Sequence, residues 1–195
     1  MSTDTDWDKW GEIDPYFGVL SSDEYRADNL NEELRAKFFH SGDVYIRRTL
    51  DAVRSHLDAG YQPERCVDFG CGVGRLVIPL AGLSREVVGI DVSDHMLAEA
   101  ASNCEKRNVE NVALVKSDDR LTQLDGSFNL IRGRPLQEPA MQLHTYDLEA
   151  ILCLLKAAGV ASIYLHPFTH DEFQSVTLYG QKSDRHSVSE STTTT

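Results

Sequence analysis

The spacing of apolar residues changes character along the chain. Between about residues 29 and 60, apolar side chains recur every three or four positions, which is the period of an amphipathic helix. They form two runs, Leu30, Leu34 and Phe38, and then Ile46, Leu50, Val53 and Leu57. We therefore expect two helices here, the second ended by Gly60 and Pro63.

Short β-rich runs alternate with helical ones from residue 65 onward. The predicted strands are residues 65–69, 87–92, 112–116 and 128–131. The predicted helices between them are residues 73–82, which contain Pro79, and residues 94–107, with Ser93 as N-cap. This alternation is typical of βαβ units around a parallel sheet, so the fold class is predicted as α/β, doubly wound and mostly parallel.

The remaining segments complete the predicted domain organisation. A helix over residues 147–159 precedes two strands, 161–165 and 175–180, which form an antiparallel C-terminal hairpin around a turn at 167–172. Residues 1 to about 20 show neither period and read as an acidic arm that docks through its aromatic side chains. The expected division is an arm at 1–22, a domain at 23–182 and a disordered tail at 183–195.

Composition adds that the chain is an ordinary globule. Of its 195 residues, 41% are hydrophobic and 26% are charged. Apolar runs stay well short of the roughly 18 residues of a membrane span, and the first residues do not resemble a secretory signal. The four cysteines form no C-x-x-C pair. We expect a cytoplasmic protein with reduced thiols, no membrane partner and no metal site.

The charge distribution bears on the partner. The net charge is −12, and residues 1–33 hold ten acidic residues against only Lys9 and Arg26. An acidic surface repels a phosphate backbone. The expectation is a small-molecule substrate, neutral or cationic, and no nucleic acid.

A glycine-rich turn is the strongest chemical signal. Gly70, Gly72 and Gly74 follow an apolar strand directly and precede a predicted helix, whose free N–H groups would favour a carboxylate or phosphate. Asp91 ends the second strand, where an acceptor-only carboxylate can bind both hydroxyls of a ribose. Asp118, at the end of the third strand, could accept from an adenine amino group.

Two sequence runs carry a family resemblance. VDFGCGVGRLVIPL at 67–80 and GIDVSDHMLA at 89–98 resemble motif I and the following acidic motif of class I S-adenosylmethionine-dependent (SAM-dependent) methyltransferases. The resemblance implies S-adenosyl-L-methionine as cofactor and a cofactor-binding set of Asp68, Gly70, Gly72, Gly74, Asp91, Asp118 and Asp119. It also implies a lid near the methyl donor formed by Phe38, Phe39, Ser41 and Gly42.

The second half departs from the family pattern. About fifteen residues, 132–146, separate the fourth strand from the helix at 147–159, too few for a crossover plus a fifth strand. The fold is thus expected to be shortened. The first hypothesis is a methyltransferase, and the alternative is a SAM-binding protein impaired in transfer. A nicotinamide-dependent oxidoreductase is a weaker third, because its loop is usually G-x-G-x-x-G and Arg75 occupies the last position.

Catalytic residues are not assigned by the sequence. The cofactor supplies the reactivity in methyl transfer, so a protein base is optional. Weak candidates on the acceptor side are Glu138, His144 and Tyr146. Cys71 lacks a base partner and is interpreted as a small residue within the turn. The oligomeric state is not predicted.

Overall fold

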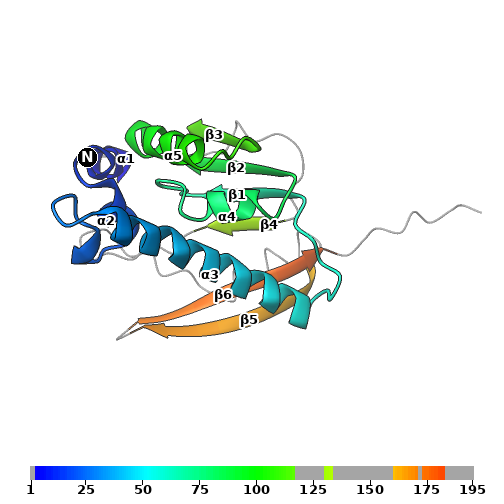
Figure 1. Cartoon of the computed structure of the whole chain (residues 1–195). Coiled ribbons are helices and arrows are strands. Elements are labelled where there is room, and N and C mark those ends of the chain that lie inside the picture. Colours follow the sequence, from blue (N-terminus) through cyan, green and yellow to red (C-terminus); the bar gives the residue numbers. More distant parts are fainter. Residues whose placement is uncertain (1–2, 117–129, 134–159, 171–172, 183–195) are drawn as a thin grey trace, which may run out of the picture. The chain divides into compact units, whose positions relative to one another are not determined.

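The computed structural model describes residues 3–116, 130–133, 160–170 and 173–182 (Figure 1). It comprises two compact units, residues 1–51 with 60–143, and residues 52–59 with 144–195, and each is considered by itself. Several predictions lie outside the described residues: the helix at 147–159, the tail, and the site residues Asp118, Asp119, Glu138, His144 and Tyr146. Within the described ranges, no helix is long and apolar enough to cross a membrane.

A four-stranded parallel sheet forms the centre of the first unit. Its strands are β1 (Arg65–Phe69), β2 (Glu86–Asp91), β3 (Val112–Lys116) and β4 (Leu130–Gly133), in the order β3-β2-β1-β4. The bounds of β1 and β3 are those predicted. The described β4 overlaps the predicted strand 128–131 at Leu130 and Ile131, and it pairs with β1 from Cys66 opposite Leu130 to Phe69 opposite Gly133.

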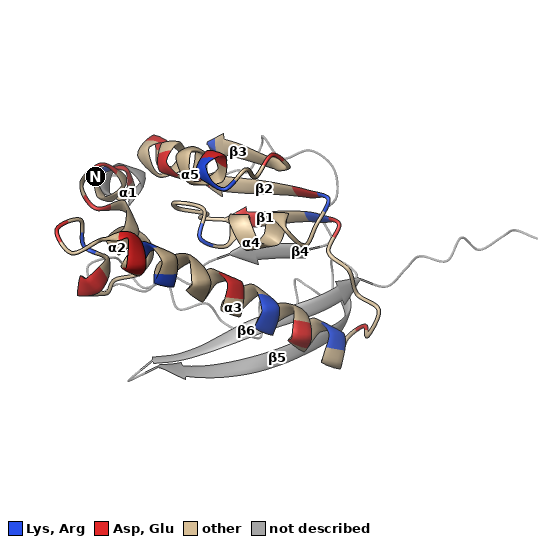
Figure 2. Ribbon diagram, viewed as in Figure 1, with Lys and Arg blue, Asp and Glu red and all other residues tan. Residues whose placement is uncertain are grey.

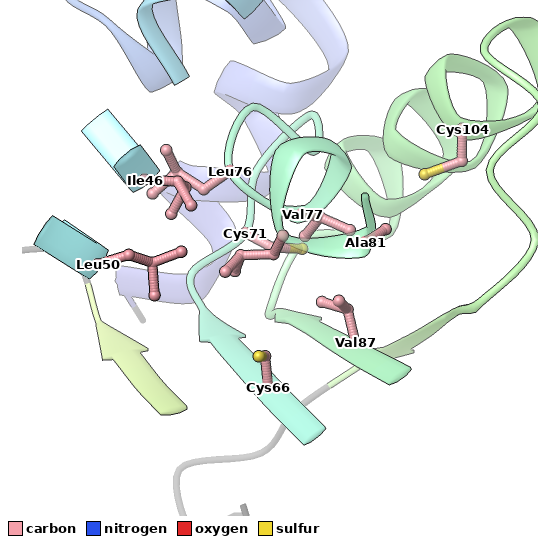
Figure 3. Close-up of a cluster of buried hydrophobic side chains, with 10 residues drawn as sticks. Ile46, Leu50, Cys66, Cys71, Leu76, Val77, Ala81, Val87 and Cys104 are labelled. Carbon is pink, nitrogen blue, oxygen red and sulfur yellow. The ribbon is translucent and has the colours of Figure 1, made fainter. Parts of the chain in front are cut away.

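Three helices pack on one face of this sheet. They are α3 (Glu32–His56), α4 (Val77–Ala81) and α5 (Asp94–Lys106). Their side chains meet those of β1 and β2 in the main core, drawn in Figure 3. Its buried members are Ile46, Leu50, Cys66, Cys71, Leu76, Val77, Leu80, Ala81, Val87 and Cys104. On the opposite face of the sheet Val67, Val88 and Ile90 are buried as well.

One continuous helix, α3, replaces the two that were predicted before the core. The prediction of two separate helices was wrong, because α3 is continuous from Glu32 to His56 and has Gly42 in its interior. A Cβ at this position would lie 2.1 Å from the carbonyl oxygen of Arg75. Pro79, four residues later, has no N–H to donate to that carbonyl, and the oxygen lies close to the backbone of α3 at Gly42. Gly42 is there because the two backbones touch.

The helix after the glycine turn is shorter than predicted. α4 begins at Val77, and not at residue 73, because the turn continues through Gly74 at positive φ. Pro79 is therefore the third residue of α4, in the first turn, where a backbone N–H has no partner within the helix. A proline inside a longer helix would produce a kink, but Pro79 has no such effect in the first turn.

The N-terminal arm is helical, contrary to the sequence interpretation. It comprises α1 (Thr3–Ile13), α2 (Pro15–Val19) and a 3₁₀ turn, η1 (Asp23–Tyr25). Its apolar residues are shared between short elements, so no single run shows a helical period. They pack with residues of α3, the glycine turn and α5 in a second core cluster. The buried members are Tyr16, Val19, Tyr25, Phe38, Phe39, Val73 and Met96.

The second unit contains an antiparallel pair of strands. β5 (Val160–His170) and β6 (Phe173–Lys182) pair along most of their length. Pro167 lies opposite Val176 within this pairing, so the strands extend into the region predicted as the turn.

Candidate functional site

The glycine turn after β1 needs all three of its glycines. Gly70, Gly72 and Gly74 have φ of +72°, +52° and +87°, in the left-handed region where residues with a Cβ are strained. Their surroundings differ. Among the described residues, a Cβ on Gly70 would meet nothing within 4 Å, whereas one on Gly72 would lie 2.5 Å from Val19 and one on Gly74 would lie 3.6 Å from Ala100. The open side of the turn is therefore at Gly70.

Backbone hydrogen bonds fix the turn to β2. The N–H groups of Gly70 and Cys71 both donate to the carbonyl oxygen of Ile90 at 2.8 Å, and that of Gly72 donates to Oδ2 of Asp91 at 2.8 Å. The sequence predicts free N–H groups at the start of a helix that would favour an anion. In the structure the N–H groups of Gly70, Cys71 and Gly72 instead have partners on β2, because the turn folds back onto β2 before α4 begins.

Asp91 is the residue that links the turn to the rest of the site. Its Oδ1 accepts from the backbone N–H of Ser93 at 3.0 Å, while Oδ2 accepts from Gly72. These two bonds fix the plane of a half-buried carboxylate. A carboxylate has about four lone-pair sites on its two oxygens, so such a group can accept hydroxyl donors of a ligand as well as backbone N–H groups.

Helix α1 of the arm contacts the start of α5, next to Asp91. Ser93 caps α5, since its Oγ accepts from Met96 N–H at 3.2 Å, and the same hydroxyl donates to Oδ1 of Asp8 at 2.8 Å. His95 Nδ1 lies 3.1 Å from that oxygen. These contacts lower the pKa of Asp8, the Ser93 hydrogen bond having the largest effect and His95 the next. Asp8 thus stays ionised beside the N-terminus of α5, where a negative charge is favourable.

The contact between Val19 and the glycine turn was not anticipated from the sequence. Val19, which ends α2, is 7% exposed, and its side chain lies directly against Gly72. Two glycines in the arm could have signalled such close packing. A Cβ on Gly11 would lie 2.6 Å from Ser93 Oγ, and one on Gly18 would lie 2.9 Å from Met96 Cε. The arm is therefore packed against the turn and the start of α5.

Asp68 and Cys71 lie beneath the turn. Asp68 is 1% exposed and Cys71 is 3% exposed. Burial raises the pKa of the Cys71 thiol well above its usual value, and the carboxylates of Asp68 and Asp91 act in the same direction. The thiol is held protonated, in agreement with its interpretation as a small residue of the turn.

The predicted lid segment belongs to the core. Phe38 and Phe39 are 0% and 4% exposed, so they do not form a movable cover over a ligand. Ser41 donates to the carbonyl oxygen of Phe38 at 2.6 Å and accepts from Nη1 of Arg75 at 3.2 Å. Gly42 touches the Arg75 backbone. The segment thus holds α3 against the turn, and the lid interpretation is wrong because these aromatic rings are needed to bury the arm.

A second concave surface in the described part of the chain lies away from the glycine turn. An open groove of about 480 Å³ lies between the end of α5 and β3, lined among others by Ala101, Glu105 and Val112. It is at the amino end of the strands, away from the glycine turn. In the described part of the chain, no group of three or more His, Cys, Asp or Glu side chains is placed to hold a metal ion.

The sequence around this site matches a known protein family. Residues 66–158 match the family described as methyltransferase domain. This segment is a methyltransferase domain. The match spans the glycine turn and Asp91, and the resemblance to class I SAM-dependent methyltransferases is confirmed. S-adenosyl-L-methionine, the cofactor expected from the sequence, is the one that this family uses.

Solved structures confirm the Rossmann-like fold class of the methyltransferase domain. Magnesium protoporphyrin IX methyltransferase from Synechocystis, with bound S-adenosylhomocysteine, has a TM-score of 0.59 at 19% identity and covers 92% of this chain and 95% of its own. Phosphoethanolamine N-methyltransferase 1 from Haemonchus contortus has a TM-score of 0.52 at 21% identity, over 79% of this chain and 28% of its own.

Sequence relatives point to RNA. A 23S rRNA (uracil(1939)-C(5))-methyltransferase of Aeromonas hydrophila is 33% identical over 72 residues, 37% of this chain and 16% of the relative. An uncharacterised RNA methyltransferase of Thermosynechococcus vestitus is 34% identical over 70 residues, 35% of this chain and 16% of the relative. The chain thus matches about one sixth of the length of either relative.

These relatives correct the predicted partner. The expectation of a small-molecule substrate and no nucleic acid rested on the net charge, and it is contradicted by relatives named as rRNA and RNA methyltransferases. The reasoning failed because the charge is uneven. Residues 1–33 carry −8, whereas residues 34–56 hold five basic and two acidic residues (Figure 2). The net charge of the whole chain therefore describes neither residues 1–33 nor residues 34–56.

Proposed function

We propose that the chain binds S-adenosylmethionine at the glycine turn and Asp91 and transfers its methyl group to an acceptor. The observation that carries this proposal is the contact between Gly72 and Asp91, which joins the two motifs of the family into one oriented site. Asp91 is assigned to the ribose hydroxyls, and Gly70, Gly72 and Gly74 to the methionine end of the cofactor. Asp68 contributes from beneath the turn, and Asp118 with Asp119 is assigned to the adenine.

The described residues fit this cofactor. In the part of the chain that the structure describes, the ligand side of the turn is open at Gly70, where no heavy atom lies within 4 Å of an added Cβ. The carboxylate of Asp91 is oriented by two N–H donors and keeps acceptor capacity for a vicinal diol. The half-buried setting of Asp91 strengthens such hydrogen bonds relative to bulk water.

The cofactor supplies a methyl group on a positively charged sulfur, which a nucleophile displaces in line. The task of the protein is to hold the donor still and to align the acceptor. Glu138, His144 and Tyr146 remain the candidates for the acceptor side, and the predicted cytoplasmic location also stays a prediction.

The first experiment tests cofactor binding. Isothermal titration calorimetry of the chain with S-adenosylhomocysteine should show one binding event, and titration with NAD should show none. Asp91→Asn should weaken the binding of S-adenosylhomocysteine. Asp94→Asn is its control, because Asp94 is an exposed acid three residues further on, paired with Lys116. Binding of NAD and not of S-adenosylhomocysteine would overturn the proposal in favour of an oxidoreductase.

The second experiment tests transfer and leaves the acceptor class open. Release of S-adenosylhomocysteine is followed with rRNA transcripts and, in parallel, with amines, phosphobases and tetrapyrrole carboxylates. The RNA arm follows from the sequence relatives, and the small-molecule arm follows from the solved neighbours. Cofactor binding without turnover on either panel would instead support the alternative, a SAM-binding protein impaired in transfer.

A further inference from the structure

Tyr16 of α2 occupies the centre of a buried polar network that none of the site assignments uses. It is 3% exposed, and the single hydrogen of its hydroxyl is shared between two acceptors, Oε1 of Glu99 at 2.7 Å and Oδ1 of Asn103 at 3.0 Å. Nη1 of Arg35 donates to the phenolic oxygen, and the guanidinium carbon lies 4.5 Å from the centre of the ring. One hydroxyl therefore joins α2, α3 and α5.

The network ends on the glycine turn. Nδ2 of Asn103 donates to the carbonyl oxygen of Val73 at 3.0 Å, and both residues are buried, at 2% and 0% exposure. Val73 lies between Gly72 and Gly74, the two glycines at positive φ that face protein. Rotation of the Val73 carbonyl turns the peptide plane between Val73 and Gly74 and therefore changes the φ angle of Gly74. Asn103 therefore fixes the shape of the turn, and Tyr16 lies against the amide that does so.

The hydroxyl of Tyr16 is a constant donor. Burial raises the pKa of Tyr16 to about 12, and the hydrogen bond to Glu99 acts in the same direction. The hydroxyl thus stays protonated at neutral pH. A network of this kind, with its members satisfied by one another, specifies a single arrangement of the elements that it joins.

Val19 provides the second contact between α2 and the turn. It lies one helical turn after Tyr16 and packs its side chain against Gly72. The two ends of α2 therefore act on adjacent residues of the turn, one through packing and one through Asn103. Displacement of α2 would remove both contacts together.

We infer that Tyr16 is a positioning residue of the cofactor site, which couples docking of the N-terminal arm to the shape of the glycine turn. This rests on the proposed function, since the ligand of the turn is S-adenosylmethionine. Coupling between two sites is reciprocal, so the cofactor stabilises the docked arm to the same extent that the docked arm favours the cofactor. The residue acts through Asn103 and does not touch the ligand itself.

Hydrogen exchange of the ligand-free chain provides the first test. Tyr16→Phe removes only the hydroxyl, and Tyr25→Phe is the matched control, because Tyr25 is 5% exposed in the same aromatic cluster. We expect Tyr16→Phe to speed exchange at residues 70–74 relative to the β2 amides of Val87 and Val88. Tyr25→Phe should leave this ratio unchanged. Equal effects of the two variants on the turn would overturn the inference.

Calorimetry with S-adenosylhomocysteine provides the second test. Tyr16→Phe should weaken binding by about two- to tenfold, the size expected for one buried hydrogen bond, with no change in Tyr25→Phe. In an Asn103→Ala background the Tyr16→Phe effect should largely vanish, because the link to Val73 is already cut. Equal affinities of Tyr16→Phe and the parent chain would overturn the coupling to the cofactor.

The two tests separate this inference from the proposed function. A selective effect on exchange at residues 70–74, in a chain that shows no affinity for S-adenosylhomocysteine, would support the positioning role and overturn the proposed ligand. Normal affinity together with no selective effect on exchange would support the ligand and overturn the positioning role.

Discussion

The backbone N–H of Gly72 donates to the carboxylate of Asp91 across 2.8 Å. Nineteen residues separate the two in sequence, and the contact means that the glycine turn and the acid of β2 cannot be altered independently. A ligand that binds the carboxylate also acts on the turn.

Asp91→Asn should weaken binding of S-adenosylhomocysteine by about 1–3 kcal/mol, as expected for the loss of charge-assisted hydrogen bonds. The amide keeps one acceptor but turns an NH₂ group toward the N–H of Gly72 or Ser93. Calorimetry measures the change, with Asp94→Asn as the control of equal charge. Similar losses in both variants would show that only net charge matters.

Gly72→Ala and Gly70→Ala form a second comparison. Both place a Cβ at positive φ, which costs about 1–2 kcal/mol, but only the methyl at position 72 meets a side chain, 2.5 Å from Val19. We expect urea unfolding to show a larger loss of unfolding free energy for Gly72→Ala. Gly72→Ala combined with Val19→Ala should recover part of the difference. A loss as large for Gly70→Ala would contradict the packing of the arm.

Gly42→Ala should destabilise the chain although alanine is the better helix former by roughly 1 kcal/mol. The added methyl would lie 2.1 Å from the Arg75 carbonyl oxygen, so α3 must move away from the turn. The cost of such overpacking is about 1–3 kcal/mol. Gly82→Ala is the control, since its nearest neighbour would be at 3.6 Å. The two variants should shift the midpoint of thermal unfolding in opposite directions or by clearly different amounts.

Acid should loosen the docked arm. The pKa of Asp8 is lowered by Ser93 and His95, so its contribution to stability is present above the ordinary value of 3.8 and is lost as the pH falls through the lower value of the folded state. Both tryptophans of the chain, Trp7 and Trp10, lie on α1. Their fluorescence should therefore change below about pH 3.8. In Asp8→Asn that step should be missing, and its persistence would place the titrating group elsewhere.

Much of the site could be predicted because its signals are local in sequence. A glycine turn between strand and helix, and an acid at the end of the next strand, depend on nearest neighbours along the chain. The positions of the three glycines, of Asp91 at the end of β2 and of the Ser93 cap agree with the sequence, while the cofactor roles of these residues stay predictions. The strands β1 and β3 have the predicted bounds for the same reason.

The arm could not be predicted in this way. Tyr16 and Val19 are buried only because α3 and α5 bring Phe38, Phe39 and Met96 to them, and a period cannot be recognised in helices as short as α2. The continuity of α3 could not be predicted for a related reason, because only the approach of the Arg75 carbonyl explains a glycine in the middle of this helix.

The sheet order has a consequence for how the chain is made. β1 lies between β2 and β4, and its second neighbour, Leu130–Gly133, follows it by about sixty residues. At a synthesis rate of about 5–20 residues per second, one side of β1 therefore waits roughly 3–12 seconds for its hydrogen-bonding partner. During that interval a nascent chain that has finished β2 and β3 presents an unpaired apolar edge, the kind of surface that chaperones recognise and that other nascent chains can join.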